Sequence, residues 1–352
     1  MLQNILLAKD EKAELISPRT IENGKLKLVP SKDWTSGFFA GQLWYLYEFT
    51  RDKKWKAKAD SFTLLLEKEQ FNASTHDMGF KMYNSYGIGY RLTKNAHYKA
   101  VIIQSAKTLA TRFNKKTGTI RSWDHHADVW DFPVIIDNMM NLELLFAATR
   151  LTGDSLYYNI AVSHANATLK NHFRKDYSSY HVVDYDTITG NVKKKMTHQG
   201  FADESAWARG QGWALYGFTM CYRETKDKKY LHQADSIAAF ILHHPNLPAD
   251  GVPYWDFNDT AIPAVPRDAS AAAVIASGLY QLSKFSKQSK EYKIAADKIL
   301  TSLTNNYRSA IGENFGFILL HSTGNKPAKS EIDVPINYAD YYYLEALLRS
   351  KK

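Results

Sequence analysis

Residues 137–157, DNMMNLELLFAATRLTGDSLY, contain the pattern that decides the fold of this chain. A polar pair opens the stretch, an apolar run follows, and a Thr-Gly-Asp tag at 152–154 precedes an aromatic ring at Tyr157. Similar tags follow apolar runs elsewhere, each about 16 positions after a polar residue. The polar residues and the tag starts are Asp33 and Thr50, Asp77 and Thr93, Asp137 and Thr152, Arg209 and Thr225, and, more loosely, Ser270 and Ser286. Internal repetition of this kind indicates a repeat architecture.

We interpret each repeat as a helical hairpin made of an inner helix, a tag turn and an outer helix. The outer segments carry apolar residues at i, i+3 and i+4 with Lys and Asp between them, as a surface helix does. They cover residues 53–70, 97–113, 156–173, 229–243 and 291–307. The inner segments, such as Gly37–Gly41 and Ala271–Ala276, are small and apolar on most sides. The Asp or Asn of each tag is expected to cap the following outer helix.

A sixth inner segment, Asn337–Leu348, leaves one outer position vacant, and Leu2–Ile16 is expected to fill it as a helix. We therefore predict an all-α fold, an (α/α)6 barrel or six-hairpin toroid, with residues 1–352 forming a single domain. Short β-hairpins on the rim are expected at His181–Tyr185 and Phe315–His321. An open helical solenoid is the alternative, but it needs capping repeats and more regular spacing.

The amino-acid composition indicates which kinds of partner and location to expect. The net charge is +9, yet the lysines are dispersed along outer-helix faces and the tight run is Lys193–Lys195. This distribution argues against a nucleic-acid partner and fits a small anionic substrate. The single cysteine, Cys221, stands in an apolar segment, so a buried free thiol is expected. No apolar stretch reaches the roughly 18 residues of a membrane span, and Met1–Lys12 lacks the pattern of a signal peptide. We expect no membrane partner and a cytoplasmic or periplasmic location.

All inner segments begin with polar residues, which a barrel brings to one rim. Helix N-termini carry partial positive charge and free N–H groups, so six of them around one mouth favour an anion. Arg209 adds a planar, bidentate partner for a carboxylate. Tryptophan rings suit stacking on sugar faces, and two or three of them are expected to line the cavity. The candidates are Trp34, Trp123, Trp130, Trp207 and Trp213.

Two carboxylates are candidates for acid–base chemistry. Asp137 has apolar neighbours at 132–136 and 139–140, so burial should raise its pKa to suit a general acid at neutral pH. Asp77 follows His76 and precedes Gly79, where the backbone can approach a ligand. Two carboxylates with separated pKa values are the usual acid–base arrangement.

Other polar residues receive structural interpretations. Asp33, Asp268 and Asp340 stand near helix starts and are interpreted as caps. The histidine pairs at 125–126 and 243–244 lack matching ligand spacing, so no metal site is expected.

Taken together, these stretches resemble glycoside hydrolase family 88, the unsaturated glucuronyl hydrolases. The matching segments are Asp33–Phe39, His76–Phe80, Ile136–Asn141, His198–Asp203, Trp207–Trp213, Arg267–Ala272 and Asn337–Tyr342. They span nearly the whole chain, and the family has the six-hairpin barrel that the repeat count predicts.

The resemblance implies roles for individual residues. Asp137 would be the general acid/base and Asp77 its partner. The implied substrate-binding residues are Trp34, His76, Trp123, His181, Gln199, Arg209 and Trp213. The substrate would be a small anionic oligosaccharide whose terminal glucuronic acid has the C4–C5 double bond left by a polysaccharide lyase. Asp137 would protonate C4 while water adds at C5, and the hemiketal would open to release the next sugar. No metal or organic cofactor is implied.

Alternatives remain open at this point. The unsaturated rhamnogalacturonyl hydrolases share the barrel, but Gln211 and the Asp137-Asn138 pair depart from their Asn and Asp-Asp pattern. A sugar-binding scaffold without activity would be expected to have lost Asp137 or Arg209. A sugar epimerase could use His76 and His198, but Asp137 would then have no role. Fragments of glycosaminoglycans and of ulvan share the same terminal uronate, and tolerance of sulfate is expected to depend on residues around the second sugar from segments 250–267 and 313–335.

Overall fold

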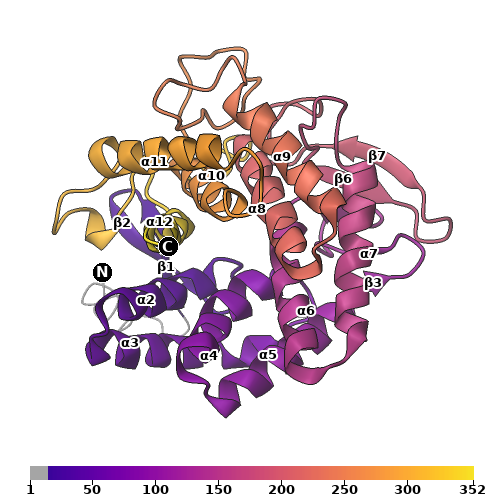
Figure 1. Cartoon of the computed structure of the whole chain (residues 1–352), viewed down its shortest axis with the longest axis horizontal. Helices are drawn as coiled ribbons and strands as arrows, with labels where there is room; N and C mark the ends of the chain where they lie inside the picture. The colour runs from indigo at the N-terminus through magenta and orange to yellow at the C-terminus, as the bar shows by residue number, and fades with distance from the viewer. Residues whose placement is uncertain (1–14) are drawn as a thin grey trace.

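In the part of the chain that the computed structural model describes, residues 15–352, six helical units form an inner ring. In chain order they are α2 (Ser36–Thr50), the π-helix η2 (Gly79–Gly87) continued by α4 (Ile88–Thr93), α6 (Asn138–Thr152), α8 (Ala208–Thr225), α10 (Ala269–Leu282) and α12 (Asn337–Ser350). Each unit packs against the next, and α12 packs against α2, which closes the ring (Figure 1). The predicted (α/α) barrel is confirmed.

An outer helix follows each of five inner units and packs against it or the next unit. These helices are α3 (Lys53–Leu64), α5 (Ala96–Ala110), α7 (Ser155–Asn171), α9 (Lys228–Leu242) and α11 (Ser289–Asn306). The tag Asp or Asn caps four of them, because its carboxyl or amide oxygen accepts the backbone N–H two residues on. Gln288, in the loosest tag, makes no such bond to α11. In the same four hairpins the second tag residue ends the inner helix with positive φ, which is why Gly153 fits there.

The prediction that Leu2–Ile16 forms a helix in the sixth outer position is wrong for the two residues that the structure describes. Residues 2–14 of the predicted helix lie outside the described residues, but Leu15 and Ile16 belong to strand β1 (Leu15–Glu22). This strand pairs antiparallel with β2 (Lys25–Pro30) and packs against α2 and α12. The turn between them is Asn23-Gly24, and both residues have positive φ. Asn-Gly is a strong hairpin signal, so the sequence did contain the evidence for this element.

Short strands build one part of the rim. β5 (Pro133–Ile135), β6 (Val182–Tyr185) and β7 (Val192–Met196) form an antiparallel sheet in that order, and β3 (Phe113–Asn114) pairs with β4 (Thr119–Ile120). The hairpin predicted around His181–Tyr185 is therefore confirmed. The second predicted hairpin is not formed as expected, because residues 314–316 form the short helix η3 and Leu319 makes only an isolated bridge to Arg308. The remaining element, the 3-10 helix η1 (Glu67–Phe71), follows α3.

Aromatic side chains fill the axis of the ring. Trp34 packs on Phe80, Phe80 on Trp213, and Trp213 on Tyr342, with ring centroids 5.3–5.5 Å apart. Cys221 is a buried free thiol, as predicted. Within residues 15–352, no helix combines the length and the apolar character that a membrane crossing requires. The middle of the barrel is thus filled by side chains.

His172, at the C-terminal end of α7, is buried and should make the free energy of unfolding depend on pH. Neither ring nitrogen has a hydrogen-bond partner, and burial holds the pKa of His172 well below its usual value. An unfolded chain binds this proton near pH 6.5 whereas the folded chain does not, so the stability contributed by neutral His172 is present above pH 6.5 and is lost as pH falls.

We expect His172→Phe to flatten this acid dependence. Below about pH 6.5, wild type should lose up to about 1.4 kcal/mol per pH unit of unfolding free energy relative to the variant. Denaturant titrations between pH 7 and 4.5 measure this difference. Comparing the two proteins removes the opposite effect of carboxyls with raised pKa, such as Asp340. Parallel stability curves would contradict the prediction.

Candidate active site

Polar residues at the starts of η2, α6 and α8 meet around one cavity of about 340 Å³. Its wall consists of Trp34, Ser74, Thr75, His76, Asp77, Ser122, Trp123, His125, Ile135, Asp137, Gln199 and Arg209. A second cavity of about 310 Å³ shares Trp34, Gln199 and Arg209 with the first. Side chains separated by up to 175 positions in sequence therefore share one site, as the repeat pattern predicts.

Asp137 lies between β5 and α6, on the wall of the cavity. It occupies the N-cap position of α6, but its carboxylate caps no backbone N–H. The residue is 7% exposed, and Oδ2 has no hydrogen-bond partner. Burial raises the pKa of Asp137 to about 6, although the positive charges of His76 and Arg209 act in the opposite direction. This is the protonation behaviour that a general acid near neutral pH needs.

Asp77 has the opposite electrostatic character. Its Oδ2 accepts the Thr75 hydroxyl at 2.6 Å, and its Oδ1 lies 3.2 Å from Nε2 of His76. Burial alone would raise the pKa of Asp77, but the charge and hydrogen bond of His76 and the Thr75 hydroxyl outweigh it and leave the pKa below its usual value. The site therefore combines a carboxyl that favours its protonated form with one that stays ionised.

Arg209 is 1% exposed, and its guanidinium is already well occupied. Nη1 donates to Asp268 at 2.9 Å and to the Thr323 carbonyl at 2.6 Å, and Nη2 donates to the Gly324 carbonyl at 2.5 Å. Nε has no partner. The two-pronged grip on a substrate carboxylate that the sequence suggested is thus taken by protein acceptors in this structure.

The other predicted binding residues divide into two groups. Trp34, His76, Trp123 and Gln199 line the cavity, so two tryptophans contribute to its wall, as expected. His181 lies behind Asp137, with Nε2 3.8 Å from Oδ2. Trp213 is fully buried and packs against Phe80 and Tyr342. It lines neither cavity of the site, because the axial stack of rings places it beneath the floor.

One of the predicted caps at the rim is confirmed and one is wrong. Asp268 caps α10, accepting the N–H of Ser270 at 3.0 Å. Asp33 lies outside α2, accepts the N–H and hydroxyl of Thr35, and pairs with Arg19 at 2.8 Å. Its carboxylate therefore orders the rim and does not cap a helix.

Asp340 does not cap α12 either. It stands in the first turn and accepts the backbone N–H groups of Ile318 and Leu319, so it anchors a neighbouring loop. Burial raises the pKa of Asp340 to about 7. Gly79 also has a different role from the predicted one. A Cβ there would lie 2.6 Å from the Cα of Asn141, so glycine permits close packing of η2 on α6 and not the approach of a ligand.

Residues that the sequence analysis did not propose as substrate-binding line the second cavity. They are Arg19, His198, Gly324, Asn325, Ala328, Ser330, Glu331 and Tyr338. Arg19 pairs with Glu331 at 2.5 Å, which ties β1 to a segment 312 positions away. His198 and Tyr338 stand in segments that match the family, and residues 324–331 lie in the segment 313–335 that was expected near the substrate, but no local pattern marked Arg19.

Buried polar atoms without partners gather at this site. Among the described residues they include His76 Nδ1, Trp123 Nε1, Asp137 Oδ2, His181 Nε2, Arg209 Nε and Tyr338 Oη. Buried polar groups in proteins are normally satisfied, so such a concentration marks a place prepared for a polar ligand or water. In the same described range, no three His, Cys, Asp or Glu side chains are grouped so that they could hold a metal ion.

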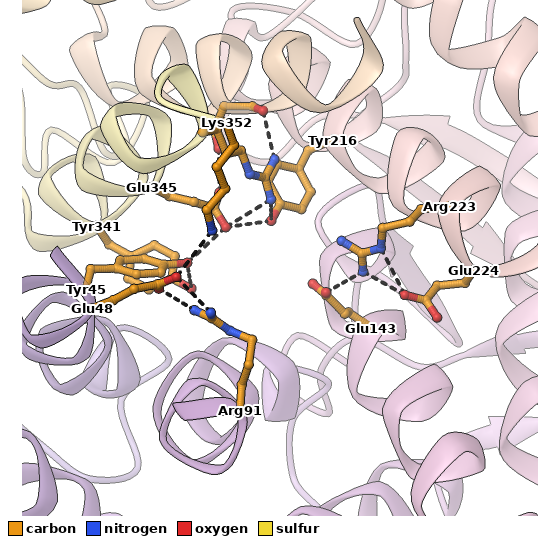
Figure 2. Close-up of polar contacts among 12 residues, drawn as sticks. Tyr45, Glu48, Arg91, Glu143, Tyr216, Arg223, Glu224, Tyr341, Glu345 and Lys352 are labelled. Atoms are coloured by element: carbon orange, nitrogen blue, oxygen red, sulfur yellow. Dashed lines mark hydrogen bonds and ion pairs between the residues drawn. The ribbon is translucent and has the colours of Figure 1, made fainter. Parts of the chain in front are cut away.

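A third cavity, of about 260 Å³, lies at the other end of the ring and differs in this respect (Figure 2). Its charged groups are mutually paired. Glu48 binds Arg91 and Lys352, Glu143 binds Arg223, and Glu345 binds Arg349. Unsatisfied charged groups line the cavity around Asp137, whereas the unsatisfied buried atom on the third cavity is the neutral amide Nδ2 of Asn84.

Comparisons with known proteins identify the family of this chain. The sequence model of Glycosyl Hydrolase Family 88 matches residues 11–349. An unsaturated glucuronyl hydrolase of Formosa agariphila is 57% identical over 325 residues, which cover 92% of this chain and 81% of that protein. An unsaturated chondroitin disaccharide hydrolase of Streptococcus agalactiae is 34% identical over 346 residues, 96% of this chain and 86% of that protein. The crystal structure of an unsaturated glucuronyl hydrolase specific for heparin matches with a TM-score of 0.94 and 50% identity, covering 99% of this chain and 94% of that chain. The chain belongs to glycosyl hydrolase family 88 and is a glycoside hydrolase.

Proposed function

We propose that this enzyme removes 4,5-unsaturated glucuronic acid from the non-reducing end of oligosaccharides made by polysaccharide lyases. The observation that carries the proposal is the pairing of a buried carboxyl with raised pKa, Asp137, and an ionised carboxylate, Asp77, on one cavity. Relatives with this fold include enzymes named for unsaturated glucuronyl and chondroitin disaccharide substrates.

The proposed reaction hydrates the double bond and leaves the anomeric carbon unattacked. Protonated Asp137 gives its proton to C4, and the charge that develops at C5 is taken up by the ring oxygen. Water adds to C5 and its proton passes to the Asp137 carboxylate, which restores the acid. The resulting hemiketal opens, releasing the next sugar and a keto-uronic acid. Because C5 and not C1 is attacked, the carboxylate-separation rule for retaining and inverting glycosidases does not apply.

The cavity suits an anionic sugar of this size. Arg209 brings a permanent positive charge to its wall, and residues at the starts of α2, η2, α6 and α8 line it. Trp34 and Trp123 offer ring faces for a sugar. One structure of a streptococcal relative is a complex with dGlcA-GalNAc6S, at a TM-score of 0.82 and 30% identity.

A panel of lyase-made disaccharides tests the proposal. It should include unsaturated fragments of chondroitin, hyaluronan, heparin and ulvan, an unsaturated rhamnogalacturonan disaccharide, and saturated counterparts as controls. We expect loss of the enol-ether absorbance with at least one unsaturated glucuronide and no hydrolysis of saturated sugars. Turnover of the rhamnogalacturonan fragment alone, or of none of the panel, would overturn the proposal.

A further inference from the structure

The protonated nitrogen of His181 is determined by its surroundings. The ring is 3% exposed and packs on Trp207, with ring centroids 4.6 Å apart. Its Nδ1 accepts the backbone N–H groups of His198 at 3.0 Å and Gln199 at 3.1 Å. A nitrogen that accepts hydrogen bonds carries no proton, so the neutral ring must hold its proton on Nε2.

That Nε2–H group faces the proposed acid. It lies 3.8 Å from Oδ2 of Asp137, and neither atom has a hydrogen-bond partner. The backbone supports this placement, because the N–H of Ile136 donates to the carbonyl of His181 at 3.0 Å. A donor and an acceptor, both buried and both unsatisfied, therefore face each other across a short gap.

The two N–H groups that select this tautomer belong to the loop 197–203, and Asp256 anchors that loop. Asp256 is fully buried, and its Oδ2 accepts the N–H of Phe201 at 2.9 Å and the hydroxyl of Ser205 at 2.7 Å. Its Oδ1 accepts the N–H of Asn258 at 2.9 Å. Glycine suits position 200 of this loop, because a Cβ there would lie 2.6 Å from the Thr197 hydroxyl and 3.2 Å from Oδ2 of Asp256.

We propose that Asp256 is a positioning residue for the reaction proposed above: by holding the loop 197–203 against His181, it fixes the Nε2–H tautomer and directs that N–H at Asp137. The inference rests on the proposed function for its catalytic meaning. When Asp137 has given its proton to C4, the His181 N–H stabilises the carboxylate until a proton returns from water. Asp256 touches no substrate and acts only through the loop and His181.

The pH dependence of the reaction should report this arrangement. Asp137 also faces His76, Arg209 and Asp77, none of which is hydrogen-bonded to Asp256. Loss of the His181 donor removes a contact that favours ionised Asp137, so the pKa of Asp137 should rise by about one unit. Since the acid form is required, the basic limb of kcat/KM should move upward by the same amount.

A double-mutant cycle tests the proposal with Asp256→Asn, His181→Phe and the double variant. We expect each single variant to shift the basic limb upward, and Asp256→Asn to add no further shift in the His181→Phe background. Ser205→Ala, a milder change at the same anchor, should shift the limb in the same direction and serves if Asp256→Asn does not fold. Asp340→Asn, which removes another buried carboxylate that anchors a loop, should leave the limb in place. Additive shifts, or no shift with Asp256→Asn, would overturn the proposal.

A second measurement does not need turnover. In ¹⁵N-histidine-labelled enzyme, the His181 signals, assigned through His181→Phe, should show an unprotonated Nδ1 in wild type and loss of that single tautomer in Asp256→Asn. A protonated Nδ1 in wild type would refute the inference even if the substrates are as proposed. If wild type turns over no unsaturated uronide while the tautomer is as stated, the proposed function fails and the positioning by Asp256 stands.

Discussion

Replacing Asp137 by asparagine is expected to lower kcat by about 10²–10⁴-fold, the usual contribution of a positioned general acid or base. Asparagine keeps the size of the side chain but cannot donate a carboxylic proton to C4 or take one from water. The Oδ2 atom of Asp137 has no protein partner, so the substitution breaks no hydrogen bond that the fold depends on. Steady-state kinetics on the best disaccharide of the panel, with substrate binding measured separately, should show lost turnover at nearly intact affinity.

The matched control is Asp340→Asn. Asp340 is also a buried aspartate whose pKa is raised by burial, to about 7, but it binds the backbone of residues 318 and 319 and lines none of the cavities around Asp137. We expect this variant to keep kcat while losing some stability. Turnover by Asp137→Asn within a few-fold of wild type would remove Asp137 from the proposed role.

Replacing Glu345 by alanine is expected to lower the free energy of unfolding by about 3–5 kcal/mol, as when one partner of a buried ion pair is removed. Glu345 is buried at the end of the barrel away from Asp137, and its Oε1 accepts from Tyr45, Tyr216 and Arg349 at 2.9–3.0 Å (Figure 2). Its Oε2 accepts the Ser277 hydroxyl at 2.5 Å. Alanine would remove this shared acceptor, so the largely buried guanidinium of Arg349 would lose its carboxylate and keep only the Ser277 carbonyl and the Tyr216 hydroxyl.

Denaturant unfolding at pH 7 measures this effect. Glu345→Gln retains an acceptor oxygen and most of the volume, so it should cost markedly less than alanine. The folded fraction of Glu345→Ala should still turn over substrate, because the axial aromatic stack separates this cluster from the acid. A loss below about 1 kcal/mol, the range of surface ion pairs, would show that the cluster is solvated and not a buried network.

Much of the fold followed from short-range patterns. The tag residues predicted caps for four outer helices, and the structure has those caps, because an Asp or Asn next to a helix start binds N–H groups only two residues away. The same locality explains the failures. The strand β1 was not predicted because it contains Pro18, which weakens a strand signal, although the Asn23-Gly24 turn marks the hairpin.

The conformation of the segment 321–335 at the site could not be predicted from the sequence for a different reason. Lys329, Glu331 and Asp333 all have positive φ, a conformation that side chains other than glycine seldom adopt. Their backbone is held by distant partners, since Glu331 pairs with Arg19 and the Gly324 carbonyl accepts from Arg209 and Gln199. No local sequence pattern predicts such a conformation.

The sequence by itself determined the order of inner and outer helices, the ends at which polar residues stand, and the apolar setting that raises the pKa of Asp137. These features depend on helix periodicity, capping and the hydrophobicity of near neighbours, which act over a few residues. Only the tertiary structure decided that Arg209 binds Asp268 and two carbonyls, and that Trp213 lies beneath the cavity floor. It also decided which nitrogen of His181 faces Asp137. The hydrogen-bond partners and the burial of these side chains depend on groups far away in the sequence, 115 positions in the case of Arg209 and Gly324. These groups meet only when the ring of helices closes.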